Sequence, residues 1–287
     1  MPTQQNMKRR IDRTRDLQSV VGTMKALAAV SIRQYEKAAE SIDAFNETVE
    51  LGLRIVLRSF GAAAPPPRDG AGGAAAVVVG SDQGMCGRFN EDAAEYALQL
   101  FQREGSGETW RVVIVGERVA APLAASGHSV VHRFDTPGAA SGITRLVQGI
   151  LSVLGNTERL GTVLVVHNRH PSGSSYEPSF ARLLPLDRRW IASFRDRPWP
   201  TNQLPAFRVE RGRLFAFLVR QYLFVAIYRA VAHSLSAENA SRLAAMQVAE
   251  KNIEERLGEL TESYHRLRQS AITGELLDIV SGFEALK

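Results

Sequence analysis

Both ends of the chain are long stretches without helix-breaking residues, in which apolar side chains recur at heptad spacing. No proline occurs between Pro2 and residue 60, and none occurs after Pro205. When positions are taken alternately four and three apart, eleven of 15 are apolar in the first stretch and twelve of 16 in the second. Such a stripe runs along one side of a helix and needs another helix to cover it. The sequence therefore predicts two long helices that pair with each other.

The predicted contact positions can be read directly from the heptad spacing. In the first helix they are Met7, Ile11, Thr14, Gln18, Val21, Lys25, Ala28, Ile32, Tyr35, Ala39, Ile42, Asn46, Val49, Leu53 and Val56. In the second they are Leu218, Tyr222, Val225, Arg229, Ala232, Ser236, Asn239, Leu243, Met246, Glu250, Ile253, Leu257, Leu260, Tyr264, Leu267 and Ala271. Because other sequence separates the helices, we expect antiparallel pairing in a left-handed coiled coil. The numbers of facing residues should then add up to about 270–274, so that Ala28 faces Met246.

The middle of the chain has the pattern of a small α/β domain. A linker rich in Gly, Ala and Pro is expected at residues 61–73. Short apolar runs that favour strands follow at 76–79, 112–115 and 163–166, with a weaker one at 129–134. Helical stretches lie between them, near 92–103, 118–126 and 139–154. Continuous apolar strands that alternate with helices indicate a mostly parallel sheet. Residues 168–206 are expected to form loops, with an edge strand around 190–192.

The fold class predicted from these patterns is α/β plus coiled coil. A small, mostly parallel Rossmann-like α/β domain at 61–206 is inserted between coiled-coil helices at 1–60 and 207–287. Since no purely apolar run approaches the roughly 20 residues that a membrane span needs, we expect no transmembrane segment. The polar, charged start of the chain does not resemble a secretory signal peptide.

The basic residues of the chain are concentrated at its start. Residues 1–33 contain seven Lys and Arg residues against two Asp, a net charge of +5 that equals the net charge of the whole chain. A basic terminal helix is typical of proteins that bind nucleic acid, an anionic membrane or an acidic protein surface. A solvated helix face without a partner is the simpler reading.

A search for catalytic motifs finds no strong candidate. Residues 80–87, Gly-Ser-Asp-Gln-Gly-Met-Cys-Gly, follow the first predicted strand, and a glycine-rich turn there can cradle phosphate. The spacing fits neither a dinucleotide fingerprint nor a Walker loop, because no Lys-Ser/Thr pair follows the glycines. We therefore expect a structural strand-to-helix turn at Gly84, Cys86 and Gly87. An enzyme that used this loop would require ATP turnover by the isolated chain.

The remaining chemically interesting side chains have ordinary structural readings. His167 and His170 are three residues apart and could share a metal ion, but no third ligand is evident, so a polar loop is expected. Cys86 is the only cysteine, which excludes an internal disulfide and agrees with a reducing compartment. No base is placed beside it, so a packed thiol is expected. We predict no catalytic residue, no cofactor and no metal.

The C-terminal end of the second helix carries an apolar stripe without a predicted partner. If the helices pair outward from the middle domain, the first helix ends near Met1. The second then continues unpaired for about 15 residues, with a rise of about 1.5 Å per residue. This end carries Ile272, Leu276, Ile279, Val280 and Phe283 on one face. An isolated helix end does not keep such a stripe in water, so an external partner should surround it. Fraying or self-association is the alternative.

Three segments of the chain resemble those of the gamma subunit of F-type ATP synthases. The longest match covers residues 236–246 (SAENASRLAAM), Asn252, Leu260, Tyr264, 268–273 (RQSAIT), 275–276 and 279–282 (IVSG). Residues 81–90 (SDQGMCGRFN) resemble the family's Ser-Asp-x-Gly-Leu-Cys-Gly segment, and residues 23–29 (TMKALAA) resemble its N-terminal helix motif. The resemblance spans the chain and implies a coiled coil that stands within a ring of alpha and beta subunits.

What the resemblance implies about function is a rotating central shaft. Such a subunit couples ion flow through a membrane c-ring to ATP synthesis or hydrolysis in the alpha–beta ring, with its α/β domain against epsilon and the c-ring. By matching motif, the residues expected to contact the alpha–beta ring are Met24, Lys25, Arg33, Arg242, Arg268, Gln269 and Thr273. The resemblance further implies a peripheral protein on the cytoplasmic face of a bacterial inner membrane, without nucleic acid or a bound cofactor.

Several positions depart from the family pattern. The family usually has a basic residue at the position of Ser31, Arg at that of Gln83 and Gly at that of Arg88, and residues 199–207 lack its Tyr-rich stretch. These changes leave the c-ring partner and the coupling ion open, and a divergent, sodium-translocating complex is one expectation. The alternative function is a basic coiled-coil protein that binds nucleic acid through its first helix, with affinity that falls steeply with salt.

Overall fold

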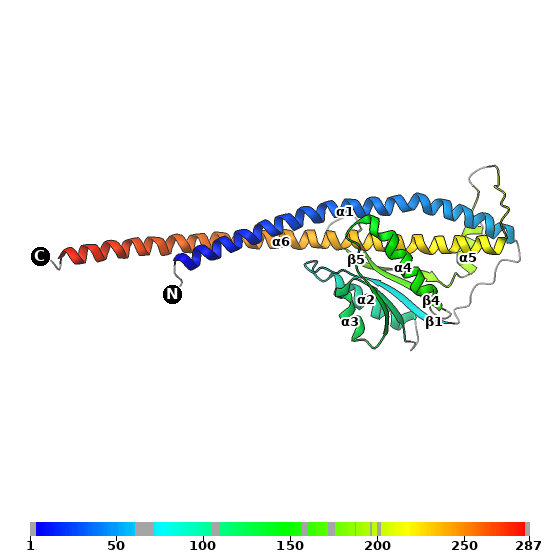
Figure 1. The fold of residues 1–287 in the computed structure, drawn as a ribbon, viewed down its shortest axis with the longest axis horizontal. Coiled ribbons are helices and arrows are strands. Elements are labelled where there is room, and N and C mark those ends of the chain that lie inside the picture. Colours follow the sequence, from blue (N-terminus) through cyan, green and yellow to red (C-terminus); the bar gives the residue numbers. More distant parts are fainter. Residues whose placement is uncertain are drawn as a thin grey trace. The chain divides into compact units, whose positions relative to one another are not determined.

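The computed structural model describes residues 4–60, 72–104, 109–156, 160–171, 176–186, 188–195, 197–199 and 202–284 (Figure 1). Nearly all of the linker predicted at 61–73 lies outside these residues. The chain divides into two compact units. The terminal unit comprises Met1–Ala28 and Arg242–Lys287, and the central unit comprises Ala29–Ser241. The division into segments 1–60, 61–206 and 207–287 stays a prediction about organisation.

Two long helices contribute to both units. Helix α1 extends over Gln4–Phe60 and helix α6 over Arg211–Glu284. Helix α6 begins with a carboxylate cap, because the Glu210 side chain accepts hydrogen bonds from the backbone N–H groups of Gly212 (2.8 Å) and Arg213 (2.9 Å). The absence of proline from both ranges lets the backbone ladder continue without interruption.

The predicted contact stripe is confirmed at every position but one. All 15 stripe positions of α1 are buried or half-buried, and so are all those of α6 except Ala271. In the terminal unit, Met7 and Ile11 pack in one cluster with Leu260 and Tyr264. In the central unit, Asp43 forms an ion pair with Arg229. These contacts confirm antiparallel pairing of α1 and α6 within each unit, in the predicted register.

The central unit contains a five-stranded sheet in the order β3-β2-β1-β4-β5. Its strands are β1 (Gly73–Val79), β2 (Arg111–Val115), β3 (Ser129–Phe134), β4 (Leu160–Arg169) and β5 (Glu177–Leu184). Four are parallel and β5 is antiparallel to β4. The helices between strands are α2 (Phe89–Glu104), α3 (Ala120–Ala124) and α4 (Ile143–Gly155), with 3-10 turns η2 (Glu117–Val119) and η3 (Ala140–Gly142). The predicted mostly parallel, Rossmann-like domain is confirmed.

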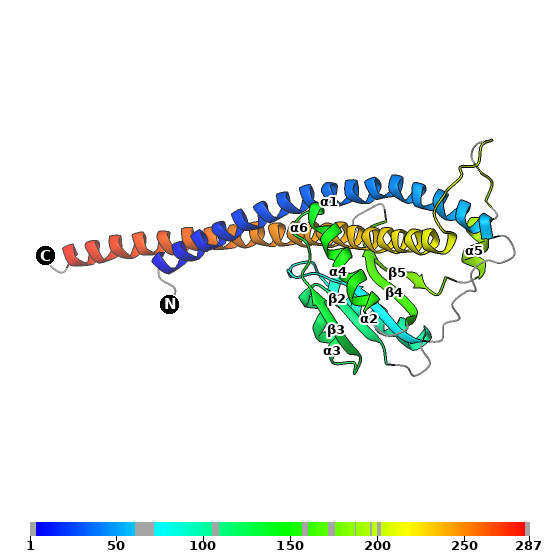
Figure 2. The ribbon, with the colours of Figure 1, turned by 45° about the vertical axis from the view of Figure 1, so that its right-hand side comes forward.

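Helices cover both faces of this sheet, as Figures 1 and 2 show. Alternate residues of each strand point to opposite faces, which is why β1 reads as a continuous apolar run. On one face Val78 packs with α2 and α3. On the other, Val77 and Val79 pack with α4 and with the parts of α1 and α6 that belong to the central unit. Two separate cores therefore lie on either side of the strands.

Three local predictions between residues 167 and 195 are wrong. Residues 190–192 lie in helix α5 (Arg188–Arg195), whose Ile191 and Phe194 pack in a cluster with Leu53 and Leu218. The edge strand is β5 instead. Its Pro178 is tolerated because an edge strand has one unpaired side. The expected polar loop at His167 is also wrong, since β4 continues to Arg169.

The composition of α6 bears on the expectation that the chain has no membrane span. By length and composition alone, α6 contains a segment apolar enough to cross a membrane. This is weak evidence, because a helix that packs in the core of a soluble protein passes the same test. Several apolar side chains of α6, among them Val225, Ile227 and Val231, are buried in the central unit.

Candidate partner-binding surfaces

The predicted contact residues of the terminal unit lie in two different environments. Lys25 forms an ion pair with Glu250 on the paired helix, with 2.5 Å between Nζ and Oε2. Arg242 is buried and Met24 is half-buried. Both charges of the Lys25–Glu250 pair are about one-third exposed, so the pair remains accessible to a partner. The contact of Lys25 with a partner stays a prediction, and sequence reasoning missed its internal partner on α6.

Arg268, Gln269 and Thr273 are exposed on α6. The Thr273 hydroxyl donates to the backbone carbonyl of Gln269 over 2.9 Å, the usual intrahelical bond of an exposed threonine. One and a half helical turns separate Arg268 from Thr273, so the three residues form a short polar surface beyond the last buried stripe residue, Leu260. Arg33, in the central unit, is also exposed.

The apolar end of α6 is exposed, as the sequence predicted. The exposed fractions are 51% for Ile272, 59% for Leu276, 66% for Ile279 and 46% for Val280. The side chain of Phe283 lies outside the described residues. With Leu277, which is 60% exposed, five large apolar side chains are exposed within nine residues of one helix. An apolar patch of this kind is typically covered by a partner protein.

Helix α1 exposes a second apolar surface that the heptad reading missed. Leu17, Val20 and Leu27 are between 56% and 64% exposed. At 100° per residue these three positions lie within about 80° of one another on the helix, on a different side from the buried stripe. These residues are spaced three and seven apart, which is the pattern of one helix face. This pattern was overlooked because the longer buried stripe runs beside it.

The glycine turn after β1 is held by hydrogen bonds and by residues with positive φ angles. Met85 and Gly87 adopt positive φ angles of 61° and 60°, and the Cys86 side chain between them is buried. Asn90, on α2, is bonded to Ser81 at the start of the turn. Its Oδ1 accepts from the Ser81 backbone N–H and its Nδ2 donates to the Ser81 hydroxyl, both over 2.9 Å. These paired bonds between β1's end and α2 favour the structural reading of the turn.

The buried titratable groups of this region suit packing better than catalysis. Burial lowers the pKa of His167 to about 4, and its Nδ1 lies 3.3 Å from the Ser179 carbonyl oxygen. Burial also lowers the pKa of His233. Tyr176 has a raised pKa, from burial and from the hydrogen bond that it donates to Asp92 over 2.8 Å. Among the residues that the structure describes, no group of three His, Cys, Asp or Glu side chains is placed to hold a metal ion.

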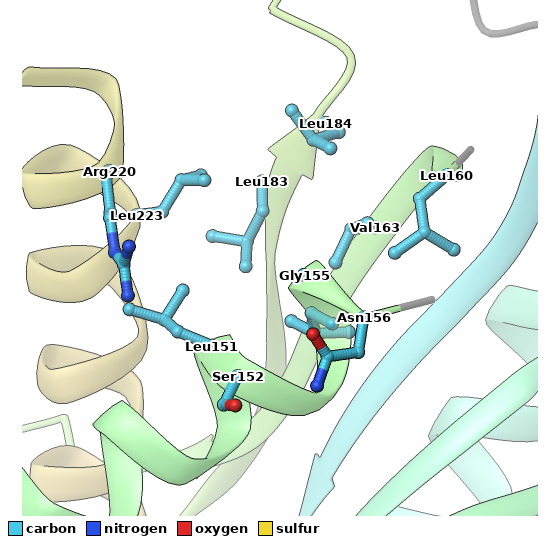
Figure 3. A pocket seen from close by; sticks show the side chains of 11 residues that line it. Leu151, Ser152, Gly155, Asn156, Leu160, Val163, Leu183, Leu184, Arg220 and Leu223 are labelled. Carbon is cyan, nitrogen blue, oxygen red and sulfur yellow. The ribbon is translucent and has the colours of Figure 1, made fainter. Parts of the chain in front are cut away.

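One cavity of the central unit, about 510 Å³ in volume, lies between the end of α4, strands β4 and β5, and α6 (Figure 3). Its walls are mostly leucine and valine side chains, with Leu151, Leu183 and Leu223 facing one another across it. Arg220 from α6 supplies the charged group at its rim. Among the described residues, its lining also includes Ser152 and Asn156 but no histidine, cysteine or carboxylate, so no general base lies beside the serine hydroxyl.

Comparison with known proteins shows which family the chain belongs to. The sequence matches the family described as ATP synthase over residues 3–286. The ATP synthase gamma chain of Nitratiruptor sp. is 25% identical over 301 residues and covers 100% of both chains. That of Nitrosospira multiformis is 30% identical over 217 residues and covers 73% of each chain.

Solved structures share the fold. A chain of Euglena gracilis mitochondrial ATP synthase superposes with a TM-score of 0.70 at 15% identity, covering 99% of this chain and 94% of that one. A chain from the central stalk and c-ring of Tetrahymena thermophila mitochondrial ATP synthase superposes with a TM-score of 0.57 at 18% identity, covering 80% and 99%. Paired terminal helices, an inserted α/β domain and a family match over nearly the whole sequence agree, and the chain belongs to the gamma subunits of ATP synthase.

Proposed function

We propose that this gamma subunit is the rotating shaft that couples ion flow through a membrane c-ring to ATP synthesis or hydrolysis in an alpha–beta ring. The observation that carries the proposal is the exposed apolar end of α6, from Ile272 to Val280. A helix end of this composition needs a protein collar, and apolar contacts hold it without directional bonds that would resist turning. An asymmetric shaft then biases each surrounding catalytic site differently as it turns.

The proposed contact residues are those that the motif resemblance implies, and exposure supports part of the set, since Arg242 is buried. Arg268, Gln269 and Thr273 are available for directional contacts with a beta subunit, since all three are exposed beside the apolar end. The other proposed contact residues are Met24, Lys25, Arg33 and Arg242. The excess of basic residues in 1–33 favours contact with an acidic surface on the ring. The exposed stripe of Leu17, Val20 and Leu27 adds an apolar surface to that contact.

The α/β domain is proposed to contact epsilon and the c-ring. The complex would then lie at the cytoplasmic face of a bacterial inner membrane, with this chain as a peripheral subunit. Its departures from the family pattern at Gln83 and Arg88 lie in the α/β domain, where Arg88 pairs with Asp92 over 3.2 Å. The coupling ion, proton or sodium, is decided by the c-ring and needs its own measurement.

The proposal is tested by reconstitution with the cognate alpha and beta subunits. The isolated chain should hydrolyse no ATP and should associate with itself, because its apolar helix end is exposed. Adding it to alpha and beta should produce a complex with ATPase activity, and complete membranes should pump ions when ATP is added. Pumping that requires sodium, rather than protons, would identify the ion. Hydrolysis by the pure monomer, or absence of the chain from the assembled complex, contradicts the proposal.

A nucleic-acid-binding function is not favoured by the family match. It would also leave the apolar end of α6 without a role. Steeply salt-dependent DNA binding at physiological ionic strength, with no binding to alpha and beta, would restore that alternative.

A further inference from the structure

The strand order of the central unit creates a place where α/β proteins usually bind ligands. From β1 the chain passes to β2 and then β3 on one side, whereas β4 lies on the other side of β1. In open α/β sheets, ligands bind outside the carboxyl ends of the strands where the strand order reverses in this way. The carboxyl ends of β1 and β4 therefore define the switch-point crevice of this fold.

In this protein α6 lies across that crevice. The Ser234 hydroxyl donates to the carbonyl oxygen of Val79, the last residue of β1, over 3.4 Å. Two turns further along α6, the Ser241 hydroxyl donates to the carbonyl oxygen of Cys86 over 2.6 Å. Between them, Ala237 is fully buried in a cluster with Cys86 and Phe89. Residues three, four and seven apart share one side of a helix, so a single face of α6 makes all these contacts.

The β4 side of the crevice is also closed by α6. The ring of His233 lies 6.4 Å from the ring of His167, near the end of β4. Next to it, Asn168 is fully buried, and its Nδ2 donates to the Phe89 carbonyl at the start of α2 over 3.0 Å. Strand β4, helix α2 and the glycine turn thus form one connected surface beneath α6.

The glycine turn holds its carbonyl group rigidly toward α6. Asn90 fixes Ser81 through two hydrogen bonds, and Gly87 has a φ of 60° that an L side chain rarely adopts. A Cβ at Gly87 would also meet the Ser241 hydroxyl at 3.8 Å. The turn therefore presents the Cys86 carbonyl at a fixed position, and Ser241 is the α6 residue that meets it.

We propose that α6 occupies the switch-point crevice in place of a ligand, and that Ser234 and Ser241 clamp the helix against rotation relative to the α/β domain. The inference rests on the proposed shaft function, since only a shaft under torque has to resist such rotation. Apolar packing is weakly directional, whereas a hydrogen bond weakens steeply once its geometry is distorted. Two such bonds, about 10 Å apart along the helix at 1.5 Å per residue, resist both turning and sliding. Ser234 and Ser241 are positioning residues in this scheme.

Cys86 is a natural reporter of the clamp, because it is the only cysteine and its side chain is 1% exposed beneath α6. The first measurement is the rate at which iodoacetamide alkylates Cys86 in the native full chain, read from the mass of its peptide. Ser241→Ala should accelerate alkylation about 5- to 10-fold, as expected from the loss of one hydrogen bond in a closed state. Ser241→Thr keeps the hydroxyl and should react like wild type. Ser270→Ala, at an exposed position of α6, is the matched control.

The second measurement separates a torque clamp from a contact that only holds the fold. In membranes carrying the complete complex, the number of ions pumped per ATP hydrolysed should fall at least twofold in the Ser234→Ala/Ser241→Ala variant, while assembly is retained. Cys86 alkylation in that complex should be faster during ATP turnover than at rest.

Each failure has its own meaning. Unchanged alkylation in Ser241→Ala, or faster alkylation with an unchanged pumping ratio, overturns the clamp. A wild-type chain that never enters an ATPase complex instead refutes the shaft function, whatever the alkylation rates.

Discussion

At the scale of single residues, close backbone contacts rather than side-chain chemistry explain the central unit's turns. Gly116 has a φ of 92°, and a Cβ there would lie 2.6 Å from the Ser81 backbone nitrogen. The turns after β1 and β2 pack against each other at this point, where the Gly80 N–H donates to the Val115 carbonyl over 2.8 Å. Separation of the two turns would break this hydrogen bond.

We predict that Gly116→Ala destabilises the central unit by about 3 kcal/mol, from backbone strain and overpacking together. Gly127→Ala is the matched control, because Gly127 has a φ of 79° but a Cβ there would meet nothing within 4 Å. The control should lose only about 1 kcal/mol. The urea concentration at which Cys86 becomes reactive measures both variants. Equal losses would show that the contact with Ser81 relaxes easily.

His167 should make the stability of the central unit depend on pH. Burial lowers its pKa in the folded protein to about 4, whereas an unfolded chain has the ordinary pKa of about 6.5. As pH falls from about 6.5 to about 4, the unfolded chain binds a proton that the folded chain rejects, so stability falls with pH in that window. The change amounts to about 3 kcal/mol at most. Below about pH 4 both states are protonated and this contribution becomes constant.

Urea unfolding between pH 7 and pH 4 measures this dependence. His167→Gln should flatten the curve, whereas His170→Gln, just beyond the end of β4, should leave it unchanged. The groups facing His167 are His233 on α6, Arg169 on β4 and the Ser179 carbonyl on β5. A curve of the same slope in wild type and His167→Gln would assign the effect to other groups.

At the scale of elements, the helices and strands that could be predicted from the sequence are those with a regular pattern of apolar residues. The heptad stripes identified both long helices and their register, because a buried stripe tolerates no shift of pairing. The parallel strands were found as continuous apolar runs, since β1 is covered on both faces. Helix α5 and strand β5 were missed because each is short and is covered by other elements on one side only. Neither therefore has a continuous run of apolar residues in its sequence. Their positions depend on tertiary contacts such as Phe194 with Tyr222, whose ring centroids are 5.9 Å apart.

Of the candidate site, the sequence predicted the local features but not the contacts between distant residues. The exposed end of α6 and the structural turn at Cys86 followed from local sequence, because one lacks a partner stripe and the other has glycines after a strand. The Lys25–Glu250 pair and the Ser241–Cys86 contact join residues more than 150 positions apart. No local pattern encodes such contacts, so only the folded chain reveals them.

The register of the helix pair can be tested with disulfides in a Cys86→Ser background. Ala28 and Met246 are both buried stripe positions of the terminal unit. Lys25 with Glu250, and Met7 with Tyr264, place Ala28 opposite residues near Met246. Cysteines at 28 and 246 should form an intramolecular disulfide under mild oxidant, because closure requires α-carbons within about 7 Å. Cysteines at 28 and 253, two turns further along α6, should not. Disulfides formed only between two copies would indicate a parallel dimer.

At the scale of the whole molecule, the two units have different kinds of surface. The central unit has a buried core on each face of its sheet, further buried clusters, and a cavity lined mainly by leucine and valine. The terminal unit has few fully buried side chains, with Met7, Ile11 and Leu260 at the centre of one cluster. It exposes apolar and charged residues side by side along α6. A unit with so small a core is suited to a helix pair that is stabilised further by the proteins around it.

Directional contacts at the end of that surface should control turnover rather than assembly. Large apolar side chains are exposed at the end of α6, in Ile272, Leu276, Ile279 and Val280, so assembly should depend chiefly on these side chains. Arg268 can donate charge-assisted hydrogen bonds to a beta subunit, each worth roughly 1.5–3 kcal/mol. If such bonds form at only some rotational positions, their loss changes the energy differences between positions and hence the rate.

We therefore predict that Arg268→Ala lowers ATP hydrolysis by the reconstituted complex about 10-fold, as expected when roughly 1.4 kcal/mol of such stabilisation is lost from the rate-limiting position. Gln269→Ala should act in the same direction with a smaller effect, because its bond is neutral. Arg266→Ala is the matched control, since this exposed arginine lies near Glu262 of its own helix, 3.8 Å away, on another side of α6. Gel filtration checks assembly and steady-state hydrolysis checks turnover. Normal turnover in an assembled Arg268→Ala complex would remove Arg268 from the contact, and loss of assembly would mean that polar rather than apolar contacts hold the shaft in its collar.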